Sequence, residues 1–427
     1  MNRSILSRFN VVKTIGEETW VYNTLTSSFI KLPTKQWDSL PLQDDKELIT
    51  ILLQQGILID ETVNEVDKYK YYFYSKIFNK DILNVTIAPT MQCNFSCPYC
   101  FEGNNKNFSQ MSEEIENQIV QFLIKQSEKK KIQICWFGGE PLLAFKKILS
   151  ISNKLNENNI SYSANIITNG SLFKEEVIKN LSSLHLTHIQ ISLDGVGEEH
   201  DKNRHYKNGK ASFDDICQNI EKLLQQTDIK ICLQVGVDNS KLNSYRDVYF
   251  YMKKRFPEAL ATKQIEIGDN VIKDRTDFDT NNNCLSKKQL FEKDLRELKD
   301  PIYKHFCPGL PGLSLPCMYR LPYALAIDSK GYIYHCLEHM GNPSLSIGNI
   351  TQGQVSSMKL ANMTFAEDPF NDEECLHCKV LPICGGDCPL DRIKEKGKKE
   401  KSYCSYYKDY LADLLPYMYN INHKTES

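Results

Sequence analysis

Three closely spaced cysteines are the strongest chemical signal in this sequence. In TMQCNFSCPYCFEG, Cys93, Cys97 and Cys100 stand as C-x3-C-x2-C directly after an apolar segment that is typical of a β-strand. Thiolates at this spacing on one loop can wrap around a single soft metal centre. Three ligands favour a 4Fe–4S cluster with one open iron, because a structural zinc site closes with four protein ligands. The alternative is a zinc knuckle with a distant fourth ligand, although structural zinc sites usually use paired CxxC hooks.

A second group of cysteines crowds the last third of the chain. It comprises Cys307, Cys317, Cys336, Cys375, Cys378, Cys384, Cys388 and Cys404. Eight thiolates are the number that two 4Fe–4S clusters with four cysteines each require. Two zinc sites with the same ligands are the alternative. Because this part of the chain has few long apolar runs, we expect metal to replace a hydrophobic core there.

Composition limits the class of protein. The chain has 15 cysteines, and its start, MNRSILSRFN, lacks the apolar core of a signal peptide. Because disulfides do not persist in the cytosol, clustered cysteines there are more often metal ligands or catalytic thiols. A formal charge of −2 argues against a protein that binds nucleic acid through a basic face. No apolar run approaches the roughly 18 residues of a membrane span, so we expect a cytoplasmic protein that binds neither nucleic acid nor membrane.

Alternating strands and helices are predicted to position the first cysteine group. From about residue 82, apolar β-rich segments alternate with helical patterns such as SEEIENQIVQFLIKQ. This alternation predicts parallel pairing through crossover helices. About six such units predict an α/β fold, a partial (βα)6 TIM-like barrel with its chemistry at the carboxyl ends of the strands. The predicted strands are 83–89, 132–137, 163–168, 187–193, 229–237 and 263–268.

Three domains are expected, at 1–80, 81–300 and 301–427. In the first, VVKTIGEETWVYNTLTSSFIKL alternates like two short strands, and two short helical patterns precede ILID, which predicts a small α+β unit. This unit is either a packing extension or a module that grips a partner peptide, for example by adding a strand to a sheet edge. The last domain, rich in proline, glycine and cysteine, is expected to hold the second cysteine group.

The first cysteine loop resembles that of the radical S-adenosylmethionine (SAM) enzymes. Their signature, C-x3-C-x-aromatic-C, is met by Cys93, Cys97, Tyr99 and Cys100. The resemblance implies that the open iron chelates the amino and carboxylate groups of SAM, and that one electron then cleaves SAM to a 5′-deoxyadenosyl radical. It also implies a reduced flavodoxin or ferredoxin as the electron donor.

The ends of the next strands agree with this resemblance. In the family, a GGEP turn after the second strand lets the backbone approach the SAM amino group, and the turn here holds Gly138, Gly139 and Glu140. The resemblance implies that the SAM-contacting residues at the following strand ends are Thr168, Asn169, Ser192, Asp194 and Arg204. Each position alone is better explained as an ordinary strand-to-helix turn. Their occurrence at successive strand ends favours the functional interpretation.

The C-terminal array resembles the seven-cysteine SPASM extension of radical SAM enzymes that modify peptides and proteins. The match runs from Cys317 to Cys404 in order and spacing, including the element C-x13-G-x4-C. It implies two auxiliary 4Fe–4S clusters, of which the first would be held by Cys307, Cys317, Cys336 and Cys388. The second would be held by Cys375, Cys378, Cys384 and Cys404. If Cys307 is not a ligand, the first auxiliary cluster keeps an open iron that could bind substrate.

The same resemblance implies an oxidoreductase-type maturase of ribosomally made peptides. Its radical would abstract hydrogen from a carbon of the peptide, and a thioether or another cross-link would follow. The unit at 1–80 loosely resembles the leader-peptide-recognition modules of such maturases. The general base is not assigned, and Glu338 and His339, beside Cys336, are the candidates for groups near the substrate.

Three alternatives stay open. One is oxidation of a protein Cys or Ser to formylglycine, as in sulfatase-maturing members of the family. Those members carry an aspartate base after the cysteine of the G-x4-C element, whereas Leu337 follows Cys336 here. The others are radical chemistry on a small metabolite and a redox sensor in which SAM cleavage is vestigial.

Overall fold

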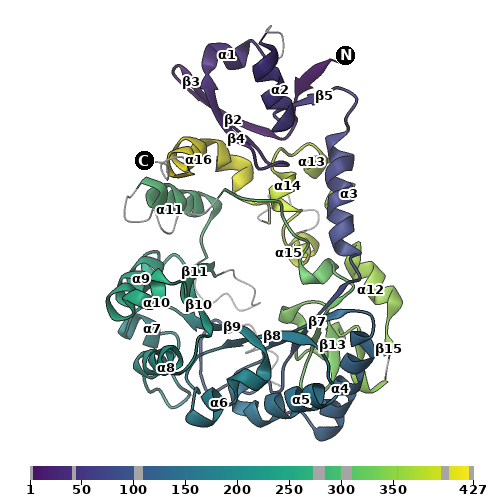
Figure 1. Ribbon diagram of the computed structural model, residues 1–427, viewed down its shortest axis with the longest axis vertical. Coiled ribbons are helices and arrows are strands. Elements are labelled where there is room, and N and C mark those ends of the chain that lie inside the picture. The colour runs from purple at the N-terminus through teal and green to yellow at the C-terminus, as the bar shows by residue number, and fades with distance from the viewer. Residues whose placement is uncertain are drawn as a thin grey trace. The chain divides into compact units, whose positions relative to one another are not determined.

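The computed structural model describes residues 3–40, 45–100, 109–272, 284–299, 310–352, 354–395 and 403–422. The chain divides into two compact units, and Figure 1 labels many of their helices and strands. The sheet unit comprises residues 79–285 and 321–364. The cysteine-rich unit comprises residues 1–78, 286–320 and 365–427. In the described residues, the sheet unit has one 10-stranded sheet and the cysteine-rich unit has two smaller sheets.

Six parallel strands form the centre of the sheet unit, and each pairs with the next along the chain. Buried and half-buried residues alternate along Tyr162–Thr168, as expected for a strand with one face toward a core. The strands confirm the predicted α/β fold and lie where the sequence predicted them. They are β6 (Ile82–Ile87), β7 (Lys131–Trp136), β8 (Tyr162–Thr168), β9 (Leu186–Leu193), β10 (Lys230–Val237) and β11 (Ile265–Val271).

Helices follow the strands and cover them with apolar faces. In the first long helix, Ile119, Val120 and Leu123 are buried, and the Ser112 side chain caps the amino end by accepting a hydrogen bond from the Ile115 N–H. The helices are α4 (Glu113–Ser127), α5 (Phe145–Glu157), α6 (Glu175–Lys179), α7 (Glu198–Asp201), α8 (Phe213–Gln226), α9 (Ser244–Arg255) and α10 (Pro257–Ala261). Short 3-10 helices are η2 (Pro141–Ala144) and η3 (Leu181–Leu184).

The sheet continues beyond the six predicted strands. β12 (Ala324–Ile327) pairs in parallel with β6, and three short antiparallel strands extend the edge. The remaining elements of this region are β13 (Tyr332–Tyr334), β14 (Gly348–Asn349), β15 (Gln354–Val355), α12 (Ser357–Thr364), η6 (Leu337–His339), η7 (Pro343–Leu345) and η8 (Ile350–Gln352). Residues 321–364 belong to the sheet unit, although all residues after 300 were expected to form one domain. Strands of two to four residues are too short for alternation to reveal them.

A buried carboxylate joins α4 to α5. Glu116 Oε1 accepts hydrogen bonds from Ser150 Oγ (2.5 Å) and Lys154 Nζ (2.6 Å), and Oε2 accepts one from Lys147 Nζ (2.9 Å). Burial raises the pKa of Glu116, but these hydrogen bonds outweigh it and hold the pKa below its usual value.

Glu116→Gln is therefore expected to destabilise the protein in a pH-dependent way. Because the folded-state pKa is lowered, the stabilisation is present above the unfolded-state value of about 4.3 and is lost as the pH falls through the folded-state pKa. We expect a loss of about 1–2 kcal/mol at pH 7, since the two lysines are partly exposed. Thermal unfolding of both proteins at pH 7 and pH 4 measures this. An equal difference at both pH values would contradict it.

The cysteine-rich unit combines the N-terminal strands with the C-terminal helices. Its strands are β1 (Ser4–Leu6), β2 (Asn10–Ile15), β3 (Glu18–Asn23), β4 (Phe29–Pro33) and β5 (Leu58–Asp60). Its helices are α1 (Thr34–Asp38), α2 (Lys46–Gln54), α3 (Glu65–Ile77), α11 (Lys287–Lys299), α13 (Glu373–Leu376), α14 (Leu381–Cys384), α15 (Pro389–Lys394), α16 (Tyr407–Asn422), η5 (Met318–Arg320) and η9 (Pro369–Asn371). Among the described residues of both units, no helix is both long and apolar enough to cross a membrane.

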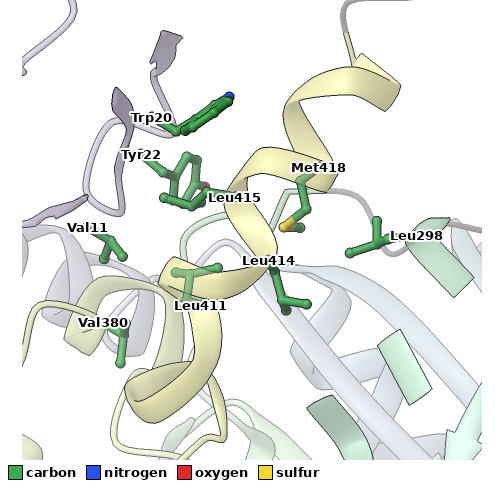
Figure 2. Packing of buried hydrophobic residues seen from close by; sticks show 9 residues of the cluster. All are labelled: Val11, Trp20, Tyr22, Leu298, Val380, Leu411, Leu414, Leu415 and Met418. Carbon is green, nitrogen blue, oxygen red and sulfur yellow. The ribbon is translucent and has the colours of Figure 1, made fainter. Parts of the chain in front are cut away.

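The N-terminal strands and the C-terminal helix share one hydrophobic core (Figure 2). The cluster contains Val11, Trp20, Tyr22, Leu298, Val380, Leu411, Leu414, Leu415 and Met418. Its members come from β2, β3, α11 and α16 and from the cysteine-bearing segment. The predicted strands and helices are present, but one face of their sheet packs against Leu298, Val380 and side chains of α16, which come much later in the chain. A deletion of residues 1–80 would therefore also expose the core beside the cysteines.

Candidate functional site

The three cysteines of the first group lie on the loop that follows β6. Cys93, Cys97 and Cys100 line one cavity of about 160 Å³. The cavity is also lined by Phe95, Tyr99, Phe137, Gly138, Gly139, Ile167, Thr168, Asn169, Ser192 and Arg204. These residues come from the carboxyl ends of β6 to β9 and the segments that follow them. The structure thus brings most of the residues predicted for the first cysteine group and for SAM together, at the edge where parallel α/β folds place their chemistry.

The two glycines of the GGEP turn allow the cysteine loop to pack closely. A Cβ atom at Gly139 would lie 2.4 Å from the Gln92 carbonyl oxygen, and one at Gly138 would lie 2.3 Å from that of Thr90. Gly138 also has a φ of +111°, which side chains rarely tolerate. The Glu140 N–H donates to the Gln92 carbonyl at 2.8 Å. The turn after β7 therefore supports the backbone just before Cys93.

Glu140 ties that turn to the end of β8. Its carboxylate is fully buried and accepts hydrogen bonds from Leu142 N (3.0 Å), Thr168 Oγ1 (2.8 Å) and Asn169 N (2.8 Å). Burial raises the pKa of Glu140, and these three donors oppose that shift. The side chain thus acts as a brace between two strand ends, and it is not among the residues that line the cavity in the described part of the chain.

Asn169 continues the brace toward the cysteine loop. Its Nδ2 donates to Asn94 Oδ1 at 2.8 Å and lies 4.0 Å from Cys93 Sγ. Burial raises the pKa of Cys93 to about 12. This thiol therefore needs a bound metal to become a thiolate at neutral pH, because coordination deprotonates a thiol.

A buried network of charged groups closes the other side of the cavity. Asp194 Oδ2 accepts hydrogen bonds from Tyr99 Oη (2.6 Å) and Lys241 Nζ (2.8 Å), and Arg204 donates to Tyr99 Oη at 3.2 Å. Burial lowers the pKa of Arg204, but Tyr99, Cys97 and Asp194 raise it above its usual value, so the side chain stays cationic. Its buried Nε has no hydrogen-bond partner among the described residues. An unpaired cationic donor beside a cavity fits an anionic ligand group.

Lys241 is the member of this network that sequence reasoning missed. Its side chain is 2% exposed, it pairs with Asp194, and its Nζ lies 3.6 Å from Asp238 Oδ2. Its Nζ also lies 5.3 Å from the centre of the Tyr99 ring. The available signal was its place three residues after Asp238, at the end of the fifth predicted strand.

Four cysteines of the second group line one pocket in the cysteine-rich unit. They are Cys375, Cys378, Cys384 and Cys404. Burial raises the pKa of Cys384 to about 11. Four cysteines that line one pocket are a donor set that suits both a 4Fe–4S cluster and a structural zinc ion.

The remaining predicted ligands are placed less completely. Cys317 and Cys388 both belong to the cysteine-rich unit. Burial is the largest cause of the raised pKa of the Cys317 thiol, and its electrostatic interaction with Cys388 raises that pKa further. Cys336 belongs to the sheet unit, where Glu338 and His339 follow it in η6. Cys307 lies outside the described residues.

Comparison with known proteins supports the family resemblance predicted from the first cysteine loop. The family model described as "Radical SAM superfamily" matches residues 87–235, which contain the cysteine loop and the ends of β7 to β9. Among curated proteins, the cysteine-type anaerobic sulfatase-maturating enzyme of Clostridium novyi is 27% identical over 365 residues, which cover 77% of this chain and 94% of that protein. These matches confirm the predicted resemblance.

Solved structures show the same fold over more of the chain. Native anSMEcpe with bound AdoMet and Cp18Cys peptide has a TM-score of 0.61 at 20% identity and covers 81% of this chain and 100% of that one. Streptococcus suis SuiB bound to precursor peptide SuiA has a TM-score of 0.54 at 14% identity and covers 94% of this chain and 99% of that one. At these identities, the likeness is one of fold.

Proposed function

This chain is a radical SAM enzyme, and we propose that it uses its radical to modify a ribosomally made peptide. The observation that carries the proposal is the cavity shared by Cys93, Cys97 and Cys100 with the ends of the next three strands. A 4Fe–4S cluster and SAM, once bound and reduced by one electron, supply a 5′-deoxyadenosyl radical that removes hydrogen from a substrate carbon. The residues of the chain hold and orient these groups.

The proposed roles follow the chemistry of the donors. Cys93, Cys97 and Cys100 line the cavity and would hold the cluster through three thiolates, one fewer than would close it. Arg204 offers its cationic guanidinium, with an unpaired Nε, to the carboxylate of SAM. Of the other predicted SAM-contacting residues, Tyr99, Gly138, Gly139, Thr168, Asn169 and Ser192 line the cavity. Glu140 and Asp194 support them through hydrogen bonds.

Two auxiliary 4Fe–4S clusters complete the proposed cofactor set. The pocket of Cys375, Cys378, Cys384 and Cys404 supports the second of them. The ligands proposed for the first are Cys307, Cys317, Cys336 and Cys388. We propose a reduced flavodoxin or ferredoxin as the electron donor and the cytoplasm as the compartment, because thiolate ligands and reduced clusters need a reducing environment.

A peptide substrate is supported by the edge strand of the N-terminal sheet. Among the described residues, β4 pairs only with β3. Partly buried apolar side chains of β4, α1 and α2 extend the neighbouring core toward the surface. They are Ile30, Leu32, Trp37, Leu48 and Ile49. An open strand edge beside an apolar surface suits a peptide leader that adds one strand to the sheet. Such docking would raise the concentration of the core peptide at the radical site.

The β3–β4 ladder shows which groups of β4 face outward. Hydrogen bonds from Thr34 N to the Glu17 carbonyl and from Asn23 N to the Ser28 carbonyl flank the paired residues. Because hydrogen-bonded pairs alternate in antiparallel sheets, even-numbered residues of β4 bond to β3 and odd-numbered residues face away. Proline at position 33 has no N–H, so Phe29 and Lys31 are the outward donors of β4.

Lys31→Pro tests this docking without removing the core. The substitution deletes one outward N–H and leaves the β3 ladder intact, so we expect the KM for a leader-bearing peptide to rise about tenfold, the worth of one hydrogen bond. SAM cleavage without peptide should not change. Lys31→Ala is the matched control, because it removes the same contacts with Glu18 and Tyr419 but keeps the N–H. Equal KM values for the two variants would discard strand addition at β4.

Formylglycine formation is the second candidate. It is favoured by the 27% identity to a sulfatase-maturating enzyme over 77% of the chain. The aspartate expected after the G-x4-C cysteine is replaced by Leu337, which weighs against it. Glu338 and His339 stay the proposed groups near the substrate, and a small-metabolite substrate is not favoured by any described feature.

Anaerobic reconstitution followed by mass spectrometry tests the proposal. Three 4Fe–4S clusters predict about twelve irons per chain, whereas about four would refute the auxiliary clusters. With SAM, dithionite and a peptide encoded beside the gene, we expect 5′-deoxyadenosine and a peptide that has lost two hydrogens through a cross-link. Conversion of a cysteine or serine to an aldehyde in a sulfatase peptide would support the second candidate.

A further inference from the structure

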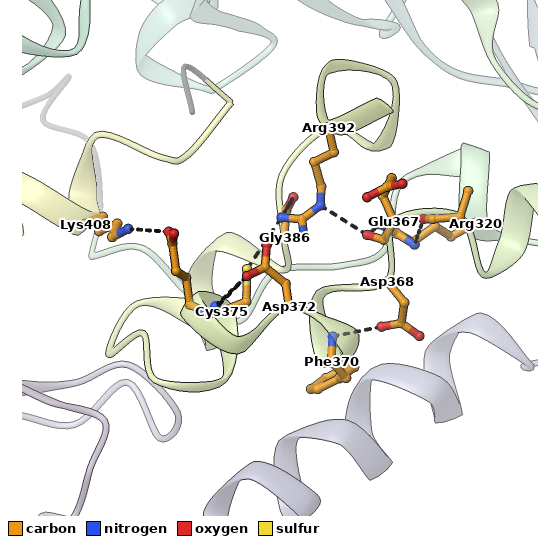
Figure 3. A network of polar contacts seen from close by, with 11 residues as sticks. Arg320, Glu367, Asp368, Phe370, Asp372, Cys375, Gly386, Arg392 and Lys408 are labelled. Atoms are coloured by element: carbon orange, nitrogen blue, oxygen red, sulfur yellow. Dashed lines mark hydrogen bonds and ion pairs between the residues drawn. The ribbon is translucent and has the colours of Figure 1, made fainter. Parts of the chain in front are cut away.

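A buried arginine lies against the cysteine pocket of the cysteine-rich unit (Figure 3). The side chain of Arg392 is 3% exposed, and its NH1 donates to Cys375 Sγ at 3.5 Å. Its other donors reach the Gly386 carbonyl (NH1, 3.4 Å), the Glu367 carbonyl (Nε, 3.1 Å) and Asp372 Oδ2 (NH2, 3.0 Å). The guanidinium is thus held in one orientation, with one of its edges on a sulfur.

The Asp372 carboxylate forms an ion pair with this arginine, and its Oδ1 also accepts from the Glu374 and Cys375 N–H groups. The Tyr403 ring lies 4.8 Å from the guanidinium carbon. Because arginine stays protonated even when buried, its positive charge also acts on the sulfurs that line the same pocket and would stabilise them as thiolates.

The same residue fixes the backbone around two of the predicted ligands. Asp372 caps the short helix that presents Cys375 through its Oδ1, and Arg392 donates to the Oδ2 of the same carboxylate. The Arg392 N–H donates to the Cys388 carbonyl at 3.1 Å. Arg392 therefore joins the segment that begins at Cys388 to the turn that carries Cys375.

We propose that Arg392 raises the reduction potential of an iron–sulfur cluster held by Cys375, Cys378, Cys384 and Cys404. This inference rests on the proposed function, because it requires that cluster. Reduction adds one negative charge to a cluster already ligated by four thiolates. A fixed cation that donates a hydrogen bond to a ligating sulfur stabilises the reduced form more than the oxidised form, so the potential rises. Arg392 is a positioning and tuning residue rather than a ligand.

Arg320 offers a matched control within the same unit. Its side chain is also buried, and its NH2 donates to the Glu367 carbonyl at 2.9 Å, the carbonyl that Arg392 contacts. Its NH1 donates to the Ala366 carbonyl at 2.8 Å. Arg320 is not among the described residues that line the cysteine pocket. Loss of either arginine removes a buried guanidinium, but only Arg392 contacts Cys375.

The test uses the full chain without its other two predicted clusters, so that the signal comes from the pocket cluster alone. Cys93, Cys97, Cys100, Cys317 and Cys336 are replaced by alanine, and iron, sulfide and thermal stability are measured after anaerobic reconstitution. About four irons per chain are expected. The midpoint potential of that cluster is then followed by electron paramagnetic resonance in Arg392→Met, Arg392→Lys and Arg320→Met.

Arg392→Met should lower the equilibrium constant for reduction about tenfold, which corresponds to 59 mV for a one-electron couple. The potential of Arg392→Lys should lie between those of Arg392→Met and the parent, because lysine keeps the charge but lacks the fixed pair of guanidinium donors. Arg320→Met should lower the thermal stability and leave the potential unchanged. A potential unchanged in both Arg392 variants, or shifted equally by Arg320→Met, would overturn the inference while the proposed cluster stands. A parent protein without iron after reconstitution would overturn both the inference and the proposed cluster.

Discussion

Gly139→Ala is expected to lower 5′-deoxyadenosine formation about 100-fold. The added Cβ would lie 2.4 Å from the Gln92 carbonyl oxygen and 2.8 Å from that of Met91, both of which are backbone atoms. The loop that leads into Cys93 must therefore shift by a substantial fraction of an ångström. Displacement of catalytic groups by about 1 Å costs on the order of 100-fold in rate. Turnover of SAM under dithionite, together with iron content, measures the effect.

Gly312→Ala is the control for this substitution. A Cβ at Gly312 meets no atom within 4 Å in the described part of the chain, and its φ is not in the left-handed region. We expect it to leave both iron content and SAM turnover at the parent level. Parent-like turnover in Gly139→Ala would show that the GGEP turn does not position the cysteine loop.

Lys241→Met is expected to destabilise the protein by about 3 kcal/mol. Both Lys241 and Asp194 have side chains that are 2% exposed, and removal of the lysine leaves the Asp194 carboxylate buried with one cation fewer. Breaking a buried pair from one side costs roughly 3–5 kcal/mol, and the remaining hydrogen bond from Tyr99 favours the lower end. The same change loosens Tyr99, so the KM for SAM should also rise. Thermal unfolding and SAM titration measure the two effects.

Lys202→Ala provides the comparison for a surface ion pair. Lys202 and Glu199 lie 3.2 Å apart, with side chains that are 67% and 41% exposed. Exposed pairs contribute about 0–1 kcal/mol, so this variant should unfold within a few degrees of the parent. If both lysine variants had the same small effect, the Asp194 network would not be a buried electrostatic support of the site.

Much of the first site could be predicted because its residues follow strand ends in chain order. The apolar segments located β6 to β10, and parallel strands bring their carboxyl ends to one edge. The C-x3-C-x2-C spacing, the GGEP turn and Thr168-Asn169 could be assigned to that edge before any contact was known. The structure refined the role of Glu140, which is engaged by three protein donors instead of facing the cavity.

The parts that were missed depend on contacts between distant positions. Lys241 and Arg392 belong to no recognisable motif, and each acquires its role from a partner on another segment, Asp194 and Cys375 respectively. Sequence periodicity likewise could not show that β12 extends the parallel sheet next to β6. Whether a charged side chain is buried depends on the tertiary fold, so the sequence pattern alone predicts that such residues are exposed to solvent.

The shared core changes how the N-terminal unit should be tested. Tyr22 of β3 and Leu414 of α16 belong to one buried cluster, so removal of the first 80 residues would disturb the unit that holds the auxiliary cysteines. A truncated protein that lost peptide turnover would therefore not distinguish a lost docking site from a damaged cluster site. The single substitutions at Lys31 separate these two causes.

Serine replacement of Cys93, Cys97 and Cys100 tests the central claim most directly. In the reconstituted protein, we expect about four fewer irons per chain than in the parent and no 5′-deoxyadenosine above the level without enzyme. Serine at Cys135, Cys217 and Cys232, which are not among the described residues lining the cavity, should leave both quantities unchanged. Parent-level 5′-deoxyadenosine after replacement of the three loop cysteines would contradict the account.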